Sequence, residues 1–100
     1  MYTQLANAVE EQKIIVTVSG ADKVGIVAEV TAVLAKYMVN IEDIKQTLMQ
    51  GHFVMFLLGD ISQSTYSFKE IKEALISTGE ELGMEVWVQR KAIFDKMHVV

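Results

Sequence analysis

The chain has 100 residues, of which 51% are hydrophobic and 22% are charged, a length and composition that indicate one globular domain and exclude a disordered chain. Thirteen acidic and nine basic residues give a net charge of −4, which argues against a nucleic-acid partner or an anionic lipid surface. The chain contains no cysteine, which excludes disulfides, thiolate metal sites and thiol nucleophiles.

Residues 1–12 are polar, with acidic residues at their end, and we interpret them as a leader that precedes the folded domain. They lack the basic stretch and the following apolar run that mark a secretory signal. The longest uninterrupted apolar run, Phe53 to Leu58, is far shorter than the ~20 residues that a membrane-spanning helix needs. We therefore expect no membrane association and a cytoplasmic location.

The first predicted element is a strand over residues 13–19, because Lys-Ile-Ile-Val-Thr-Val-Ser alternates with period two and is rich in β-branched residues. Asp22, in the turn that follows, is a candidate N-cap for the next helix. That helix is predicted over residues 24–38, where Glu29 and Lys36 are the only strongly polar residues. So broad an apolar surface exceeds what one face of a sheet covers, and we expect a second copy of the chain to bury part of it.

Residues 40–50 and 52–58 are the next two predicted strands, joined by a short turn at Gln50-Gly51. The three-residue spacing between Ile41 and Ile44 indicates a bend or bulge at the start of the first of them. The strand over residues 52–58 is apolar on both faces, so it should lie in the centre of the sheet.

A second helix is predicted from the sequence Ser67-Phe-Lys-Glu70, a capping box, to Gly83, which ends it. Residues 84–90 alternate between apolar and polar side chains and form a final predicted strand. The apolar residues Ile93, Phe94 and Met97 suggest one further helical turn that closes over an apolar surface.

The order strand, helix, strand, strand, helix, strand predicts an α+β domain over residues 13–97, followed by a tail at residues 98–100. This order is that of the ferredoxin-like βαββαβ plait, a four-stranded antiparallel sheet with two helices on one face. Enzymes, RNA-binding domains and metabolite sensors all use this fold, so the function has to be decided from particular residues.

RNA binding and catalysis find little support in these residues. The segment Gly51-His-Phe-Val-Met-Phe56 resembles an aromatic RNA-binding signature, but it is one residue short and lacks the basic start. Arg90 is the only arginine and has no glycine-rich phosphate loop beside it in the sequence. His52 and His98 do not have the spacing of metal ligands. We therefore expect no enzyme activity, no metal and no cofactor.

The turn Gly20-Ala-Asp-Lys-Val-Gly25 is the strongest candidate for a site. Its terminal glycines permit tight backbone geometry, and the helix that follows offers free amides and the positive end of its dipole. Such a turn can hold a small carboxylate, and it can equally be a capped turn with no ligand. Asn40 leaves two interpretations open as well: it can lie beside a partner subunit, or it can be the left-handed residue that ends the helix.

The sequence Val-Ser-Gly-Ala-Asp-Lys-Val-Gly-Ile-Val-Ala, followed by Asn40-Ile41 and the order of elements, resembles an ACT domain from Lys13 to about Met97. The segment Ile93-Phe-Asp-Lys-Met-His98 is similar to the end of a small group of stand-alone, single-domain ACT proteins. ACT domains generally bind amino acids or other small metabolites at dimer interfaces and regulate enzymes of amino-acid metabolism. Many of them carry Pro-Gly where this chain has Val24-Gly25.

The resemblance implies a homodimer or higher oligomer that binds an amino acid or related metabolite, with a metabolic enzyme or regulator as a further partner. The carboxylate would lie on amides of the turn, aided by Lys23, and the side chain of Asn40 would reach the ligand across the interface. The apolar flanks Val24, Ile26 and Ile41 fit an aliphatic ligand. The implied ligand-binding residues are Asp22, Lys23, Val24, Gly25, Ile26, Asn40 and Ile41.

A function of a different class is a protein-interaction module without a ligand. It would use the apolar first helix together with Ile15 and Trp87 on the open face of the sheet. Saturable binding of a small molecule would support the ligand-binding module, and binding of a protein partner would support the protein-interaction module.

Overall fold

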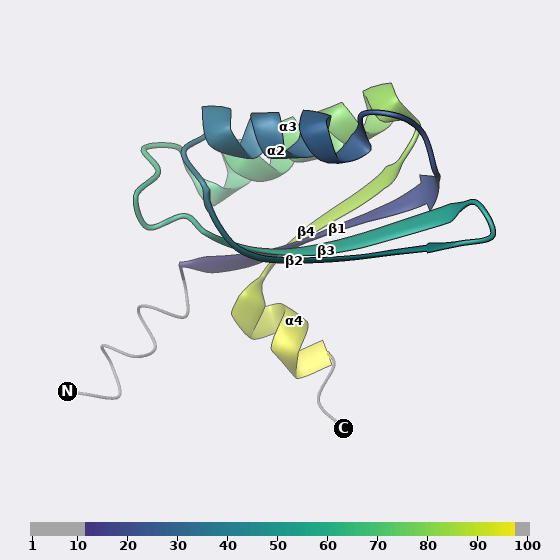
Figure 1. Cartoon of the computed structure of the whole chain (residues 1–100). Coiled ribbons are helices and arrows are strands. Elements are labelled where there is room, and N and C mark those ends of the chain that lie inside the picture. Colours follow the sequence, from purple (N-terminus) through teal and green to yellow (C-terminus); the bar gives the residue numbers. More distant parts are fainter. Residues whose placement is uncertain (1–11, 98–100) are drawn as a thin grey trace.

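A computed structural model describes residues 12–97, so the predicted leader, apart from Gln12, and the predicted tail lie outside the described residues. The elements are β1 (Lys13–Ala21), α2 (Ile26–Lys36), β2 (Asn40–Met49), β3 (His52–Asp60), α3 (Phe68–Leu82), β4 (Glu85–Arg90) and α4 (Lys91–Met97). The strands form one antiparallel sheet in the order β2-β3-β1-β4, with α2 and α3 on one face (Figure 1). The predicted ferredoxin-like plait is therefore confirmed.

The core lies between the sheet and the two helices α2 and α3. Alternate residues of the central strands β1 and β3 face these helices because successive side chains of a strand point to opposite faces. The central position predicted for β3 is confirmed. Fully buried side chains from both layers meet here: Ile14, Val16, Val18, Met55 and Leu57 from the sheet, and Val30, Leu34, Ile71 and Leu75 from the helices.

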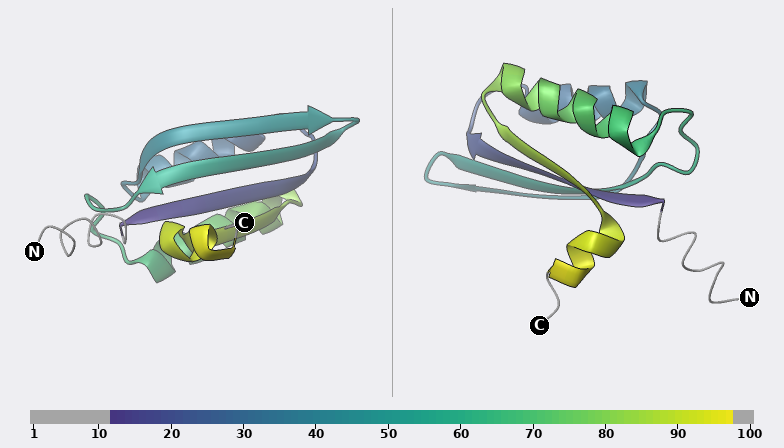
Figure 2. Two further views of the ribbon diagram at one scale, coloured as in Figure 1. Left: turned by 90° about the horizontal axis from the view of Figure 1, so that it is seen from below. Right: turned by 180° about the vertical axis from the view of Figure 1, so that it is seen from behind.

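The helix α4 lies on the opposite face of the sheet from α2 and α3. It follows β4 without a linker and lies toward β1 and β4, leaving β2 clear of it (Figure 2). The ring of Phe94 meets that of Phe56 on β3 edge to face, with 6.4 Å between the ring centroids. The predicted helical turn that closes over an apolar surface is thus present, and it covers part of the open face.

The ends of α3 are capped as predicted. The hydroxyl of Ser67 accepts a hydrogen bond from the backbone N–H of Glu70 at 3.1 Å, and the Glu70 carboxylate accepts one from the backbone N–H of Ser67 at 2.9 Å. These bonds to the ionised form lower the pKa of Glu70. Gly83 takes the left-handed conformation that ends the helix.

The ends of α2 differ from the prediction, and the helix is two residues shorter at each end. Asp22 is not its N-cap: Gly25 holds that position in the left-handed conformation, with φ of 91° and no side-chain cap. The left-handed residue after the helix is Met38 and not Asn40, which begins β2. The chain turns back at Met38 because the next residue, Val39, is buried in the core.

The hairpin of β2 and β3 has the irregularities that the sequence predicts. The register of β2 on β3 shifts between Ile41 and Asp43, which makes Glu42 the extra residue of a bulge. Gln50 and Gly51 connect the strands, both with positive φ, as the tightest two-residue hairpin turns require.

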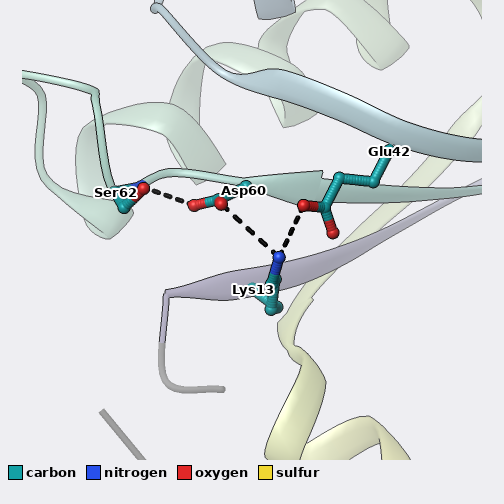
Figure 3. Close-up of polar contacts among 4 residues, drawn as sticks. All are labelled: Lys13, Glu42, Asp60 and Ser62. Carbon is teal, nitrogen blue, oxygen red and sulfur yellow. Dashed lines mark hydrogen bonds and ion pairs between the residues drawn. The ribbon is translucent and has the colours of Figure 1, made fainter. Parts of the chain in front are cut away.

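A cluster of charges joins the ends of three strands (Figure 3). The ammonium of Lys13 on β1 lies 2.5 Å from the carboxylate of Glu42 on β2 and 3.4 Å from that of Asp60 on β3. Asp60 also accepts a hydrogen bond at 2.8 Å from the backbone N–H of Ser62. The bond from Ser62 and, to a lesser extent, the charge of Lys13 lower the pKa of Asp60.

We expect Leu34→Ala to lower the free energy of unfolding by about 2–5 kcal/mol, because it leaves a cavity at a fully buried position of α2. Val24→Ala is the control, since Val24 is fully exposed and should change stability by no more than about 0.5 kcal/mol. Urea denaturation followed by circular dichroism measures both. Equal effects of the two substitutions would contradict the position of the core.

The charge cluster predicts a pH dependence. The lowered pKa of Asp60 means that the folded chain binds this proton more weakly than the unfolded chain does, so the stabilisation is complete above the ordinary aspartate pKa of about 4. It is lost as the pH falls through the lower pKa of the folded state. We expect wild type to be more stable than Asp60→Asn at pH 6, and the difference to shrink toward pH 3 in urea titrations. A difference that does not vary with pH would contradict this assignment.

Candidate functional site

A cleft of about 510 Å³ lies between the start of α2 and the edge strand β2. The turn that leads into α2 lies at the same end of the sheet as the β2–β3 hairpin (Figure 1). A backbone hydrogen bond fixes this arrangement, because the N–H of Asp22 donates to the carbonyl of Gly51 at 2.9 Å. The cleft is lined by Asp22, Lys23, Gly25, Ile26, Val27, Ala28, Gln46, Thr47, Leu48 and Phe53.

Backbone amides at the start of α2 are the donors that this cleft offers. The first bond within the helix runs from the N–H of Glu29 to the carbonyl of Gly25 at 2.9 Å. The N–H groups of the preceding residues of the first turn therefore have no acceptor within the helix, and Ile26, Val27 and Ala28 all line the cleft. No side chain caps them. Such amides, at the positive end of a helix dipole, can hold a carboxylate.

Two opposite charges lie in the wall of the cleft. Among the described residues that line it, Asp22 and Lys23 are the only ionisable ones, and both are exposed. The ammonium of Lys23 also lies 3.3 Å from the position that a Cβ on Gly83 would occupy, at the C-terminal end of α3. A cation is favourable at that end of a helix because the last carbonyls have no partner within it. Lys23 therefore lies near both the cleft and the C-terminal end of α3.

The structure brings together four of the seven residues that the resemblance implies. Asp22, Lys23, Gly25 and Ile26 line the cleft, with Ile26 forming part of its buried floor. Val24 is not among the lining residues and is fully exposed.

The other two implied residues lie far from the cleft within the same chain. Ile41 packs against the core. Asn40 is the first residue of the ten-residue strand β2, roughly 30 Å from the hairpin end where the cleft lies. Within one subunit, therefore, Asn40 and the turn cannot contact the same small molecule.

The second wall of the cleft is a finding of the structure. Gln46 and Leu48 from β2, with Phe53 from β3, were not among the candidate residues. The period-two pattern of β2 puts Ile44, Gln46 and Leu48 on one face, and this face points toward the helix layer. The pattern does not show that α2 leaves this part of β2 uncovered, which depends on how the helix packs.

Two of the smaller hollows on the open face of the sheet lie on either side of Phe94. One of about 340 Å³ lies toward β2 and one of about 210 Å³ toward β4, and Phe56 lines both. Trp87 lines the second hollow and is exposed, whereas Ile15 lines the first and is half-buried. Both residues therefore lie on the open face, as the alternative hypothesis requires.

Residues 12–97 contain no group of three or more histidine, aspartate or glutamate side chains that could hold a metal ion. His52 instead forms a hydrogen bond with the hydroxyl of Ser19 at 3.1 Å. In the same part of the chain, no helix is long and apolar enough to cross a membrane.

Comparison with known proteins agrees with this architecture. A sequence profile of the ACT domain matches residues 12–89. The chain is 48% identical to the UPF0237 protein of Listeria innocua over 84 residues, which cover 84% of this chain and 94% of that protein.

Solved structures show the same fold. The ACT domain protein from Streptococcus pneumoniae matches with a TM-score of 0.72 and 35% identity, over 83% of this chain and 93% of that one. The ligand-free regulatory subunit of aspartate kinase from Thermus thermophilus matches in fold, with a TM-score of 0.61 and 23% identity, over 80% of this chain and 52% of that one. The order of elements, the sequence profile and these relatives together show that the chain belongs to the ACT domain family.

Proposed function

We propose that the chain is a regulatory module that binds a small amino-acid-like metabolite at a homodimer interface. The observation that carries this proposal is the cleft, in which unpaired amides of α2 face an exposed edge strand. Membership of the ACT domain family supports a regulatory module. The carboxylate of the ligand would accept hydrogen bonds from the first-turn amides, with Lys23 close by.

The edge strand β2 supports a second copy of the chain as the partner. Nine of its ten residues are exposed, among them Leu48 and Met49, which are apolar. Beyond the bulge at Glu42, β2 is a long exposed edge strand with apolar side chains, and such an edge readily pairs with another strand. Two identical edges can pair antiparallel about a twofold axis, which gives a closed dimer.

The charges on β2 favour one register for this pairing over its neighbours. An axis at Ile44 sets Asp43 opposite Lys45 of the partner subunit, and the symmetry repeats this pair on the other side of the axis. An axis at Asp43 or at Lys45 would instead set like charges opposite each other, which is destabilising. Among the described residues, neither Asp43 nor Lys45 makes an ion pair within its own chain.

The same register brings the start of the partner subunit's β2 beside the cleft. With the axis at Ile44, Asn40 of the partner subunit lies within one residue of Leu48, allowing for the bulge at Glu42. On the helix-facing side of this strand, the side chain of Ile41 of the partner subunit would border the cleft, whereas that of Asn40 lies on the open face of the sheet. A ligand that contacts both subunits stabilises the dimer, so its occupancy and the association of the subunits are linked. An enzyme or regulator bound to this module would respond to the change in subunit association that the ligand causes.

The second candidate function is a protein-interaction module that uses the open face of the sheet. The exposed Trp87 and the two hollows beside Phe94 favour it. Binding of a protein that is lost in Trp87→Ala, with no small molecule bound by the wild type, would support this function over the first.

The ligand site predicts a loss of affinity in Lys23→Glu. A screen of amino acids by thermal shift and calorimetry should find a ligand that, at 100 times its dissociation constant, adds about 2.7 kcal/mol to stability. Lys23→Glu replaces the cation beside the bound carboxylate with an anion, and we expect at least a tenfold weaker affinity.

Lys69→Glu is the matched control, because it makes the same charge change at an exposed residue of α3 outside the lining of the cleft. Its affinity should equal that of the wild type. Equal affinities of all three proteins would exclude the turn as the site.

The proposed register predicts a charge-reversal experiment on the dimer. Asp43→Lys creates two like-charged pairs across the axis and should raise the dimer dissociation constant roughly tenfold at low salt. The double variant Asp43→Lys/Lys45→Asp recreates opposite charges and should restore the wild-type value. Sedimentation velocity over a range of protein concentrations measures these constants, and a failure of the double variant to restore association would contradict the register.

A further inference from the structure

We infer that the cleft takes an α-amino acid with an uncharged, apolar side chain. This inference rests on the proposed function and adds the class of ligand to it. It follows from the side chains that form the two walls of the cleft and from the balance of charge between them.

Apolar surface occurs on both walls. Ile26 and Phe53 are only 2% and 6% exposed, so they form a floor with little surface left to cover. Leu48, by contrast, is 60% exposed although it lines the cleft. A ligand side chain that packs against Leu48 removes apolar surface of both molecules from water, which favours binding in proportion to that area.

The charged groups of the cleft are already matched by the two charges that every α-amino acid carries. The amides of α2 and Lys23 complement the carboxylate, and Asp22 complements the ammonium. The remaining polar side chains, Gln46 and Thr47, are neutral. A charge on the ligand side chain would therefore lose water without gaining an opposite charge, which is costly.

The residues that make the site apolar in the structure differ from those that the sequence suggests. Of the apolar flanks expected there, Val24 and Ile41 do not line the cleft, and only Ile26 does. Leu48 and Phe53 take their place because the hairpin brings β2 and β3 beneath the start of α2. The apolar character of the site thus comes mainly from a strand that is distant in sequence from the turn.

The test is a homologous series of ligands measured by calorimetry on the full chain. Glycine, alanine, 2-aminobutyrate and norvaline share the carboxylate and ammonium groups and differ by one carbon at each step. We expect the affinity to rise about fourfold with each methylene that reaches Leu48. Glutamate and lysine, which add a charge, should bind at least tenfold more weakly than norvaline.

Leu48→Gln should reduce the gain in affinity per methylene along this series, because it removes apolar contact and keeps the groups that bind the backbone of the ligand. Met49→Gln is the matched control: it makes a similar polar replacement at the next residue, which points to the other face of β2 and does not line the cleft. It should keep the wild-type series.

The outcomes separate this inference from the proposed function. Binding of amino acids with a flat series, or with glutamate or lysine preferred to norvaline, would overturn the apolar ligand class and leave the regulatory module standing. A series that Leu48→Gln and Met49→Gln change equally would remove Leu48 from the site. No binding of any amino acid by the wild-type dimer would overturn both proposals.

Discussion

The burial of one face of β1 is the constraint on which the rest of the structure depends. Ile14, Val16 and Val18 are completely buried between the sheet and the helices. The strand β1 pairs with β3 along its whole length and with β4 from Ile14 to Ser19. A shift of one residue in either register would turn one face of a strand from the core to solvent. The fixed register also fixes where β1 ends, and hence where the turn into α2 lies against the hairpin.

The cleft is a consequence of how the chain leaves the sheet. After β1 it must rise to the helix layer within four residues, and the left-handed conformation of Gly25 turns it into the axis of α2. Glycine adopts this conformation readily because it has no Cβ. The turn therefore ends without a side-chain cap, and the amides that a cap would have covered are left facing β2.

Local signals in the sequence were sufficient for much of the fold. The capping box of α3, the bulge at Glu42 and the turn at Gln50-Gly51 each depend on residues close in sequence, and all three are confirmed. The N-cap of α2 was predicted wrongly as Asp22, because the left-handed Gly25 holds that position. Of the two interpretations of Asn40, the helix-ending one does not hold, because packing of Val39 into the core places the left-handed residue at Met38. The turn could also be predicted as part of the candidate site, because it has a local sequence pattern. Leu48 could not be predicted, because it lines the cleft only through the tertiary packing of α2 over the hairpin.

The helix α4 has a consequence for the form that any larger assembly can take. Because it crosses one face of the sheet, two such faces cannot stack flat on each other near β4 (Figure 2). The two edges of the sheet are also unequal, since β2 has ten residues and β4 only six. In the proposed dimer the two long edges would pair with each other and leave only the two short edges free, so assembly would stop at a pair of subunits and would not continue into a fibre.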